Sequence, residues 1–486
     1  MMKRVSDILR NVPVREVRGD TARMIADIQY DSRRVRPEDA FIAIRGFRTD
    51  GHRFVSQAYE KGCRVFFVEE PQSLREATQI ILPDTRRWLP LLAKNFYDGV
   101  VDHMKLIGIT GTNGKTTTAY LLHSILTTAH WRPGFISTVE YKIGEETIPA
   151  ERTTPEAIDL HRMFYRMYAR GIKSVVMEVS SHALALHRTD FMNFSAAVFT
   201  NLGHDHLDFH KDMDDYFRAK KKLFDGLSEM ARAVVNLDDA YGLPMVADTE
   251  ADVFTYSLEN REATVSLKTY RVVGEGLYLT INVPSGDISL STALIGKYNV
   301  YNVLAAVTTA VALGIPEEHI VEGVQRLQQV PGRAQKWVAP QGFKVYVDYA
   351  HAPDALRRVL EALLEFQPRR LIVVFGCGGD RDRAKRPMMG KIAEDYADII
   401  YLTSDNPRSE DPEAIIQEIL QGIYDRSRVR VEPDREAAIR QALKEARKGD
   451  IVLIAGKGHE TYQIYGDRYI HFDDREMVEK YLSLRD

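Results

Sequence analysis

The chain of 486 residues is poor in cysteine and has no excess of basic charge. Its two cysteines, Cys63 and Cys377, are too few for a disulfide framework and show no metal-ligand spacing, which favours a reducing compartment. The 65 basic and 69 acidic residues give a net charge of −4, so the chain lacks the overall basic field of a nucleic-acid-binding protein. We therefore expect no nucleic-acid partner.

Long apolar runs are also missing from the sequence. No run reaches the roughly 18 residues that a membrane span needs. The first twenty residues lack the apolar core of a signal peptide. We expect a cytoplasmic protein without membrane insertion. Because no repeat, low-complexity segment or other feature points to a protein partner, we also expect a monomer.

Short apolar runs alternate with helix-like segments, which predicts an α/β protein with parallel sheets. At about 150 residues per domain, the length favours three domains. We expect a small N-terminal α/β domain at 1–98, a central parallel-sheet domain with a phosphate-binding loop at 99–331, and a C-terminal Rossmann-like domain at 332–486. The central strands are expected at 105–110, 174–180, 196–202 and 232–238, with a loop at 248–263 and a β-rich insertion at 264–286.

The third domain contains four apolar strand candidates, and each runs into a polar or glycine-containing loop. The loops read HAPD, CGGDRDRAKRP, DNPRSEDP and KGHETYQ. In open parallel sheets, ligands bind outside the carboxyl ends of the strands. The pattern therefore predicts a binding site at this edge of the third domain.

A glycine loop, GITGTNGKTT at 108–117, follows a strand and opens a helix. Gly111 and Gly114 allow tight turns that leave backbone N–H groups and the helix N-terminus facing an anion. Lys115 can reach phosphate oxygens, and Thr116 can hold Mg²⁺. Ile109 stands where the usual P-loop has its first glycine. The loop predicts nucleotide binding. The missing first glycine argues against a P-loop NTPase that acts as a conformational switch. Such a switch is the alternative from another functional class.

Further motifs occur in order along nearly the whole chain: MEVSSHALALHR, TNLGHDHLDFH, IGKYNVYNVLAA, PGRAQ and DYAHAPDAL. Together with TGTNGKTT they resemble the Mur ligases and their relatives, the folylpolyglutamate and cyanophycin synthetases. The resemblance implies ATP-dependent amide formation through an acyl phosphate, as in peptidoglycan precursor synthesis. The spacing is most similar to the members that extend UDP-N-acetylmuramoyl-L-alanyl-D-glutamate by a third amino acid.

The resemblance implies ATP and Mg²⁺ as cofactors and assigns residues to both. The metal ligands would be Thr116, Glu178 and His206; by residue types alone, the three histidines of HDHLDFH fit a zinc site or a polar loop equally well. Lys220, in YFRAKKKLF, would be carbamylated by CO₂ to N6-carboxylysine and help to orient a metal. The implied catalytic residues are Lys115, His206, Lys220 and Arg333.

The nucleotide site implied by the resemblance extends beyond the glycine loop. Asn302 and Asp348 would contact the adenine and ribose, and Arg333 would reach the γ-phosphate. Gln335 stands where the family often has Glu. His351 fits either a helper of this site or a structural histidine at a strand end. The complete predicted ATP set is Gly111, Thr112, Asn113, Gly114, Lys115, Thr116, Thr117, Asn302, Arg333 and Asp348.

The acyl substrate is assigned to two segments by the same resemblance. The uridine diphosphate would lie on Ser32, Phe47, Arg48 and Thr49. Hydroxyl groups and one guanidinium suit a D-glutamyl-peptide carboxylate, and this set is Thr153, Thr154, Ser180 and Arg188. Some relatives have Gln at the position of Leu186, which puts one substrate hydrogen bond in question.

The incoming amino acid is assigned to the loops of the third domain. The motif DNPR at 405–408 resembles the motif for meso-diaminopimelate, whose distal carboxylate Arg408 could bind through two hydrogen bonds. The predicted set is Arg381, Asp405, Asn406, Pro407, Arg408, Gly456 and Glu460, with Glu460 facing the distal ammonium. A lysine-adding or folylpolyglutamate-type ligase is the alternative within the family.

Overall fold

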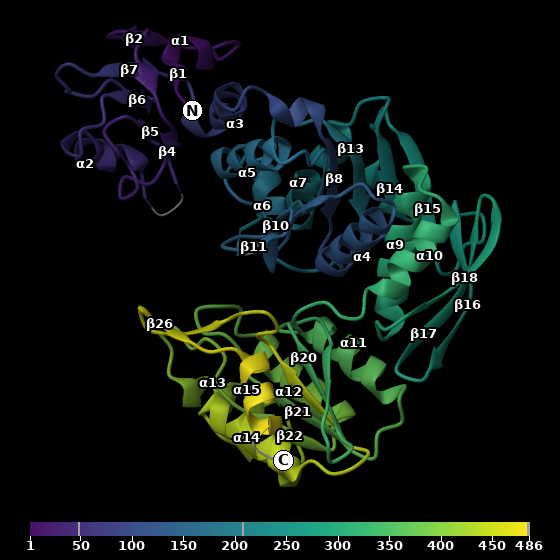
Figure 1. Ribbon diagram of the computed structural model, residues 1–486. Coiled ribbons are helices and arrows are strands. Elements are labelled where there is room, and N and C mark those ends of the chain that lie inside the picture. Colours follow the sequence, from purple (N-terminus) through teal and green to yellow (C-terminus); the bar gives the residue numbers. More distant parts are fainter. Residues whose placement is uncertain (47–48, 207–208, 484–486) are drawn as a thin grey trace. The chain divides into compact units, whose positions relative to one another are not determined.

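The computed structural model describes residues 1–46, 49–206 and 209–483 (Figure 1). The chain forms two compact units. The first consists of residues 1–264 and 305–316, and the second consists of residues 265–304 and 317–486. Across the described residues, no helix has the length and apolar character needed to cross a membrane.

The N-terminal part of the first unit is a five-stranded sheet with the order β2-β7-β6-β5-β4. Strands β4 to β7 are parallel, and β2 runs antiparallel to β7. Apolar side chains cover both faces of this sheet and form two core clusters. The elements are β2 (Glu16–Arg18), β4 (Ile28–Gln29), β5 (Ala40–Ile42), β6 (Val65–Val68), β7 (Thr78–Ile81), α2 (Val55–Glu60) and α3 (Thr85–Phe96). A short α1 (Val5–Ile8) and the strand pair β1 (Lys3–Arg4) and β3 (Met24–Ile25) precede and flank it.

The remainder of the first unit is built on a second sheet with the order β11-β10-β9-β12-β8-β13-β14-β15. Its strands from β9 to β15 in this order are parallel, which confirms the predicted parallel sheet. The strands are β8 (Lys105–Thr110), β9 (Gly134–Ile136), β10 (Glu140–Ile143), β11 (Glu146–Pro149), β12 (Ser174–Glu178), β13 (Phe194–Phe199), β14 (Arg232–Asn236) and β15 (Asp252–Ser257).

Helices accompany this central sheet, and Figure 1 labels α4, α5 and α7 around its strands. The helices are α4 (Lys115–Thr128), α5 (Ala157–Ala169), α6 (Ser181–Ala185), α7 (Met213–Asp225) and α8 (Gly242–Met245). The expected loop at 248–263 is wrong in part, because β15 pairs in parallel with β14. Only the last two residues of β15 are buried, so this strand carries little apolar pattern.

The second unit begins with an antiparallel meander that confirms the β-rich insertion. Its strands are β16 (Val265–Val273), β17 (Gly276–Val283) and β18 (Gly286–Thr292), and α10 (Glu317–Arg326) packs on β18. Burial alternates along β17 and β18, because one face of this sheet packs against apolar side chains and the other is more exposed. Helix α9 (Lys297–Ala312) contains the NVYNVLAA motif.

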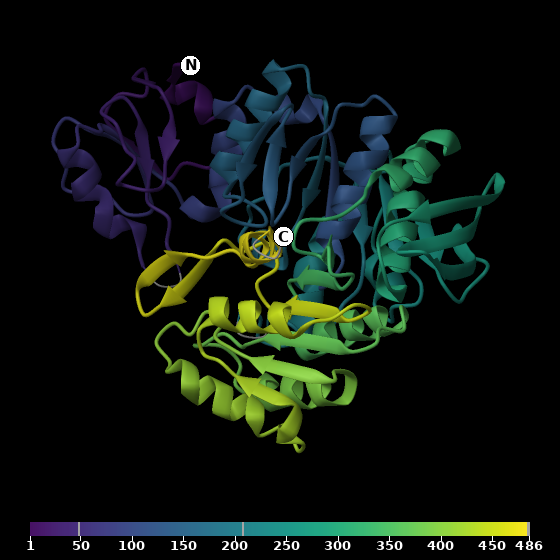
Figure 2. The same cartoon turned by 60° about the horizontal axis from the view of Figure 1, so that its bottom comes forward.

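The C-terminal sheet of the second unit has the order β19-β20-β24-β21-β22-β23, with only β19 antiparallel among these six. Helices lie on both sides of it (Figure 2), and each face has its own apolar cluster. All four strands predicted here are confirmed. The strands are β19 (Gln335–Val338), β20 (Lys344–Asp348), β21 (Leu371–Phe375), β22 (Ile399–Leu402), β23 (Val429–Val431) and β24 (Ile451–Ala455).

The helices of this region divide between the two faces. The cluster on one face draws on α11 (Pro353–Leu364), α12 (Lys385–Tyr396) and α13 (Pro412–Leu420). The other face is covered by α14 (Arg435–Glu445) and α15 (Asp474–Ser483). A hairpin of β25 (Tyr462–Tyr465) and β26 (Arg468–His471) lies between β24 and α15 in the chain. This arrangement leaves the strand ends to the polar loops.

Candidate active site

The glycine loop leaves β8 and enters α4 in a conformation that only glycine adopts easily. Gly111 has φ of +147° and Gly114 has φ of +88°, both in the left-handed region. A Cβ atom on Gly111 would lie 1.8 Å from Thr200 Oγ1. The loop is also tied to the end of β13, since Thr112 N donates to Asn201 O and Asn113 N donates to Asn201 Oδ1. The neighbouring strand therefore holds the predicted phosphate-binding loop in place.

Two lysine side chains meet at the backbone of this loop. Lys115 Nζ donates to Gly111 O at 2.7 Å and to Thr112 O at 2.8 Å. Lys220 Nζ, from α7, donates to the same Gly111 O at 2.9 Å. Its ammonium lies over the ring of Tyr216, whose hydroxyl is 3.1 Å from Thr112 Oγ1. The first unit thus brings two lysine amino groups to the place where β8 meets α4, and the ammonium of Lys115 supplies positive charge that suits a triphosphate.

Lys220 is only 1% exposed. Burial, and secondly the charge of Lys115, hold the pKa of Lys220 well below its ordinary value. A larger fraction of this side chain is therefore the neutral amine, which is the form that attacks CO₂. The resulting carbamate would replace a positive charge with a negative one next to Lys115. Carbamylation stays a prediction, but the environment favours the chemistry.

Glu178 ends β12 and is fully buried. Its Oε1 accepts a hydrogen bond from Thr138 N at 2.9 Å, and its Oε2 lies 3.1 Å from Thr138 Oγ1. Thr138 Oγ1 is in turn 3.0 Å from Thr153 Oγ1. Sequence reasoning missed Thr138, which follows β9 and would have been found only by knowing that β9 lies beside β12.

The predicted magnesium ligands fit the ion by their chemistry. Thr116 is buried in the first turn of α4, and Glu178 supplies carboxylate oxygens at the end of β12. Mg²⁺ is commonly held by one or two carboxylates together with substrate phosphates, rather than by a cage of protein ligands. Accordingly, no three His, Cys, Asp or Glu side chains among the described residues form a metal-binding group. Magnesium at Thr116, Glu178 and His206 stays a prediction.

His206 belongs to a cluster of aromatic rings. Its ring centroid is 5.0 Å from that of His182, and His182 lies 5.8 Å from His210. His210 Nε2 is 3.0 Å from Ser181 Oγ, and its Nδ1 is 3.3 Å from Asp215 Oδ2. His206 itself has φ of +56°. The sequence named His206 but missed its packing partner His182, which comes from α6.

The predicted dipeptide residues form one hydrogen-bonded group at the end of β12. Thr154 Oγ1 donates to Glu178 O and accepts from Ser180 N, and Ser180 caps α6. Arg188 Nη1 donates to Thr154 O at 2.9 Å. Its Nη2 pairs at 2.8 Å with Glu156, a carboxylate that sequence reasoning missed. Burial is the largest influence on Arg188 and lowers its pKa. Arg188 therefore already has an internal counter-ion at a site predicted for a substrate carboxylate.

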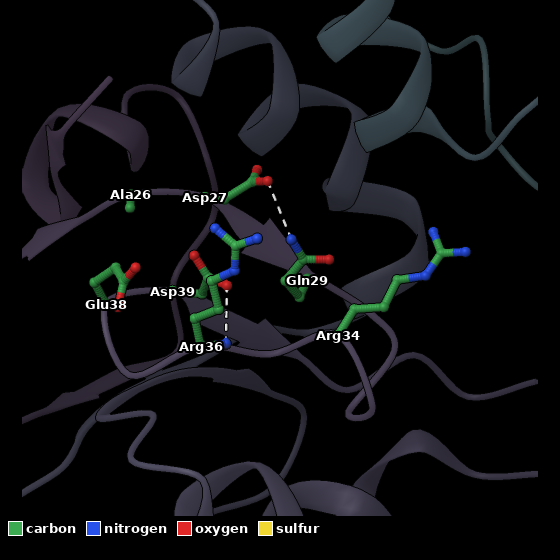
Figure 3. Close-up of a pocket in the computed structure, with 7 residues that line it drawn as sticks. All are labelled: Ala26, Asp27, Gln29, Arg34, Arg36, Glu38 and Asp39. Atoms are coloured by element: carbon green, nitrogen blue, oxygen red, sulfur yellow. Dashed lines mark hydrogen bonds between the residues drawn. The ribbon is translucent and has the colours of Figure 1, made fainter. Parts of the chain in front are cut away.

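The predicted uridine diphosphate residues are described only in part, because Phe47 and Arg48 lie outside the described residues. Ser32 is buried and donates from Oγ to Gln57 Oε1 at 2.7 Å. Thr49 O accepts from Gly46 N at 2.9 Å. Neither Ser32 nor Thr49 lines the cavity of about 450 Å³ that is formed by neighbouring residues of the N-terminal part (Figure 3). The cavity is lined by Ala26, Asp27, Gln29, Arg34, Arg36, Glu38 and Asp39.

In the second unit, the loops after β22 and β24 meet through a polar triangle. Asn406 Nδ2 donates to Glu460 Oε2 at 3.0 Å. Lys457 Nζ is fully buried and donates to Asn406 Oδ1 at 3.2 Å and Glu460 Oε2 at 3.1 Å. A Cβ on Gly456 would come within 2.7 Å of Asp405 Oδ2. The structure thus brings together four predicted residues and adds Lys457, which no motif assigned to the site.

Arg408 connects these loops to the one after β21. Its Nη1 donates to Gly379 O at 2.7 Å, and its backbone N donates to Ile464 O at 3.0 Å. Arg408 has φ of +52°, directly after Pro407. Arg381 is exposed on the loop after β21, where its Nη1 donates to Asp380 O. The loops after β21, β22 and β24 therefore carry the predicted amino-acid residues on one edge of the sheet.

Arg333, a predicted nucleotide residue of the second unit, lies close to the loop GKGHE at 456–460. The guanidinium of Arg333 lies 4.6 Å from the centroid of the Tyr349 ring, which also packs on His459. A Cβ on Gly332 would come within 2.2 Å of His459 N, so the PGR turn touches the loop directly. Gln335 Oε1 accepts from Gly332 N at 2.9 Å, a hydrogen bond that a glutamate oxygen could also accept.

Two further predicted nucleotide residues have internal partners. Asp348 is held by Ala334 N and Ala350 N, and burial raises its pKa. Asn302 Nδ2 donates to Asn299 Oδ1 within α9. His351 is exposed, with Nδ1 2.9 Å from Tyr349 O.

Comparisons with known proteins agree with this architecture along the chain. Three family models match: the Mur ligase family catalytic domain at residues 24–97, the Mur ligase middle domain at 109–310, and the Mur ligase glutamate ligase domain at 332–458. Relatives named UDP-N-acetylmuramoyl-L-alanyl-D-glutamate--2,6-diaminopimelate ligase include that of Caldanaerobacter subterraneus subsp. tengcongensis, at 43% identity over 99% of both chains. The relative of that name from Geobacter metallireducens is 42% identical over 98% of this chain and 97% of its own.

A solved structure with that same name is 31% identical, covers 100% of this chain and 99% of its own, and superposes with a TM-score of 0.71. The MurF ligase of Thermotoga maritima, solved with ADP, is 20% identical over 95% and 98% of the two chains, with a TM-score of 0.67, and so bears on the fold alone. Sequence motifs, the fold and these matches lead to one assignment: the chain belongs to the Mur ligase family.

Proposed function

We propose that the chain is an ATP-dependent, ADP-forming ligase that joins meso-diaminopimelate to the D-glutamyl carboxylate of UDP-N-acetylmuramoyl-L-alanyl-D-glutamate. Our choice of amino acid depends on one observation: Asn406, Glu460 and Arg408 lie on loops at the same edge of the C-terminal sheet. The names of relatives that are 39–43% identical over nearly the whole chain support the same reaction in peptidoglycan precursor synthesis.

The first step would transfer the γ-phosphoryl group of ATP to a carboxylate oxygen, which gives ADP and an acyl phosphate. Lys115 and the amides of the glycine loop would neutralise the phosphates. Thr116, Glu178 and His206 would hold Mg²⁺, which when bound supplies positive charge to the phosphate oxygens. A carbamylated Lys220 and a γ-phosphate contact from Arg333 stay predictions.

In the second step, the amine of the amino acid would attack the acyl carbon, lose a proton and displace phosphate. Arg408 and Arg381 would bind carboxylates of diaminopimelate, and Glu460 would face its distal ammonium. Asn406 and Lys457 fix the Glu460 carboxylate before the substrate arrives. Such a preorganised site can discriminate by leaving a buried group unpaired when the wrong amino acid binds.

The test is a set of parallel incubations with ATP, Mg²⁺ and the UDP-muramoyl-dipeptide, each with one acceptor: meso-diaminopimelate, lysine, glutamate or none. We expect phosphate release and a product mass of the diaminopimelate tripeptide in the first alone. Product with lysine or glutamate instead would favour the alternative ligases. Phosphate release that is equal without an acceptor would favour a nucleotide switch and overturn the proposal. Cytoplasmic location and a monomeric state stay predictions.

A further inference from the structure

The second unit contains an ion pair that is completely shielded from solvent. Arg435 begins α14 and Asp474 begins α15, and both side chains are 0% exposed. Two parallel hydrogen bonds join them, from Nε to Oδ1 and from Nη2 to Oδ2, each 2.7 Å long. Burying two charges carries a desolvation cost that their attraction often only offsets. Stability alone is therefore a weak reason for a buried pair at this place.

The remaining donors of Arg435 point to a more specific role. Nη1 donates to Ser404 O at 3.2 Å, and Nη2 donates to Ala455 O at 3.0 Å. Ser404 immediately precedes residues 405–408, and Ala455 immediately precedes residues 456–460. One guanidinium thus holds the carbonyl at the base of each of two predicted amino-acid-binding loops.

The sheet itself does not join these two loops. In the strand order, β21 lies between β24 and β22, so no ladder hydrogen bond connects the strands that carry them. The rigid fork of an arginine can span two carbonyls and a carboxylate with fixed geometry, whereas the ammonium of lysine cannot. Arg435 is therefore suited to set the spacing between the two loops.

The charges of the loops also act on this guanidinium. Burial works to lower the pKa of Arg435, but Asp474 is the strongest of several acids that raise it above its ordinary value. Asp405 and Glu460, one from each loop, are among the others.

We propose that Arg435, held by Asp474, is a positioning residue that sets the distance between loops 405–408 and 456–460 and thereby the affinity and selectivity for the amino-acid substrate. The inference rests on the proposed function, because it takes these loops as the amino-acid site. It adds a residue that touches no substrate and that lies outside every motif used to predict the site.

A matched control lies at the amino-end edge of the same sheet. Arg370 precedes β21 and Asp450 precedes β24, and their Nη2 and Oδ2 atoms are 2.6 Å apart. The Asp450 side chain is 0% exposed, and Arg370 Nη2 also donates to a backbone carbonyl, Glu445 O. This pair resembles Arg435–Asp474 in composition but lies at the amino ends, away from the loops.

The test compares Arg435→Lys with Arg370→Lys in the full chain, by steady-state kinetics in which each of the three substrates is varied in turn. We expect Arg435→Lys to raise the KM for diaminopimelate about tenfold or more and to reduce its preference over lysine, with the KM for ATP within about twofold of wild type. Arg370→Lys should lower the melting temperature but leave all three KM values near wild type. An unchanged KM for the amino acid, or an equal rise in all three, would overturn the proposal.

Failure of the proposed function is separately visible, because the wild type would then prefer another acceptor, and the KM comparison is made with that acceptor. Amide hydrogen exchange gives a second readout that needs no turnover. In Arg435→Lys we expect faster exchange at residues 403–408 and 455–460 together, and no such change in Arg370→Lys. If Arg435→Lys folds poorly, the uncharged pair Arg435→Met with Asp474→Leu is measured in the same way, and unchanged exchange at both loops rejects the proposal.

Discussion

The carboxyl edges of the central sheet and of the C-terminal sheet differ in the groups that hold their basic side chains. At the central sheet, the amino groups of Lys115 and Lys220 share one backbone carbonyl, Gly111 O. At the C-terminal sheet, Lys457 is paired with Glu460 and Arg435 with Asp474. At the first edge, a backbone carbonyl holds both lysine amino groups, whereas at the second edge carboxylates hold Lys457 and Arg435 before any ligand binds. A polyphosphate is attracted by field strength, whereas a zwitterion is selected by the geometry of paired groups.

The largest effect should come from removing a charge at the first edge. Lys115→Met is expected to lower kcat/KM for ATP about a thousandfold, because no other group of the glycine loop carries a positive charge to the phosphates. Lys105→Met, at the other end of β8, is the control and should stay near wild type. The rate of phosphate release, measured at varied ATP concentration, gives kcat/KM for both variants. Equal activity of the two variants would refute the role of Lys115.

At the second edge, Arg408→Ala should act on one substrate only. Losing a guanidinium that binds a carboxylate costs about 1–3 kcal/mol, so we expect the KM for diaminopimelate to rise about ten- to a hundredfold with little change for ATP. Arg430→Ala, at an exposed position in the same sheet, provides the control. Kinetics with an unchanged KM and kcat for diaminopimelate would remove Arg408 from the site.

Lys457→Met sharpens the comparison by leaving Glu460 without its buried counter-ion. Breaking a buried pair from one side typically costs about 3–5 kcal/mol, and partial exposure of Glu460 should reduce this to about 2 kcal/mol. Urea denaturation measures the free energy of unfolding of Lys457→Met and of the double variant Lys457→Met with Glu460→Gln. The double variant should recover part of the stability that the single variant loses. If the single variant is as stable as wild type, the pairing does not order this edge.

The smallest expected effect concerns Lys220 and pH. Its pKa is depressed by burial in the folded state, so below the ordinary lysine range the unfolded chain binds the proton that the folded chain lacks. Without CO₂, the free energy of unfolding should therefore rise with pH toward that range, and Lys220→Met should flatten the rise. Lys222→Met, exposed on the same helix, should keep the wild-type slope. Equal slopes for all three proteins would contradict the assigned environment of Lys220.

The sequence predicted the strands well where both faces are buried. KLIGIT coincides with β8, and the four strands of the C-terminal sheet lie within their predicted segments, because continuous apolar runs report burial on two faces. The strand β15 was missed since only Tyr256 and Ser257 of its six residues are buried. The domain boundaries near 98 and 331 stay a prediction.

For the site, motifs identified groups that would touch a ligand but not the groups that hold them. Thr138 and Glu156 contact predicted residues from other segments, and no local pattern marks them. Arg435 reads as an ordinary first-turn arginine in DREAAIRQ, and its burial depends on Asp474 in a helix that follows much later. Such residues become visible only when the fold has brought distant segments together.

The most direct test of the contrast between the two edges is a competition in one tube that contains ATP, Mg²⁺, the UDP-muramoyl-dipeptide and equal amounts of meso-diaminopimelate and lysine. Mass spectrometry of the products should show the diaminopimelate tripeptide in about tenfold excess or more for the wild type, and a much smaller excess for Arg408→Ala. Equal products from the wild type, or the same ratio from both proteins, would contradict selection by the paired edge of the C-terminal sheet.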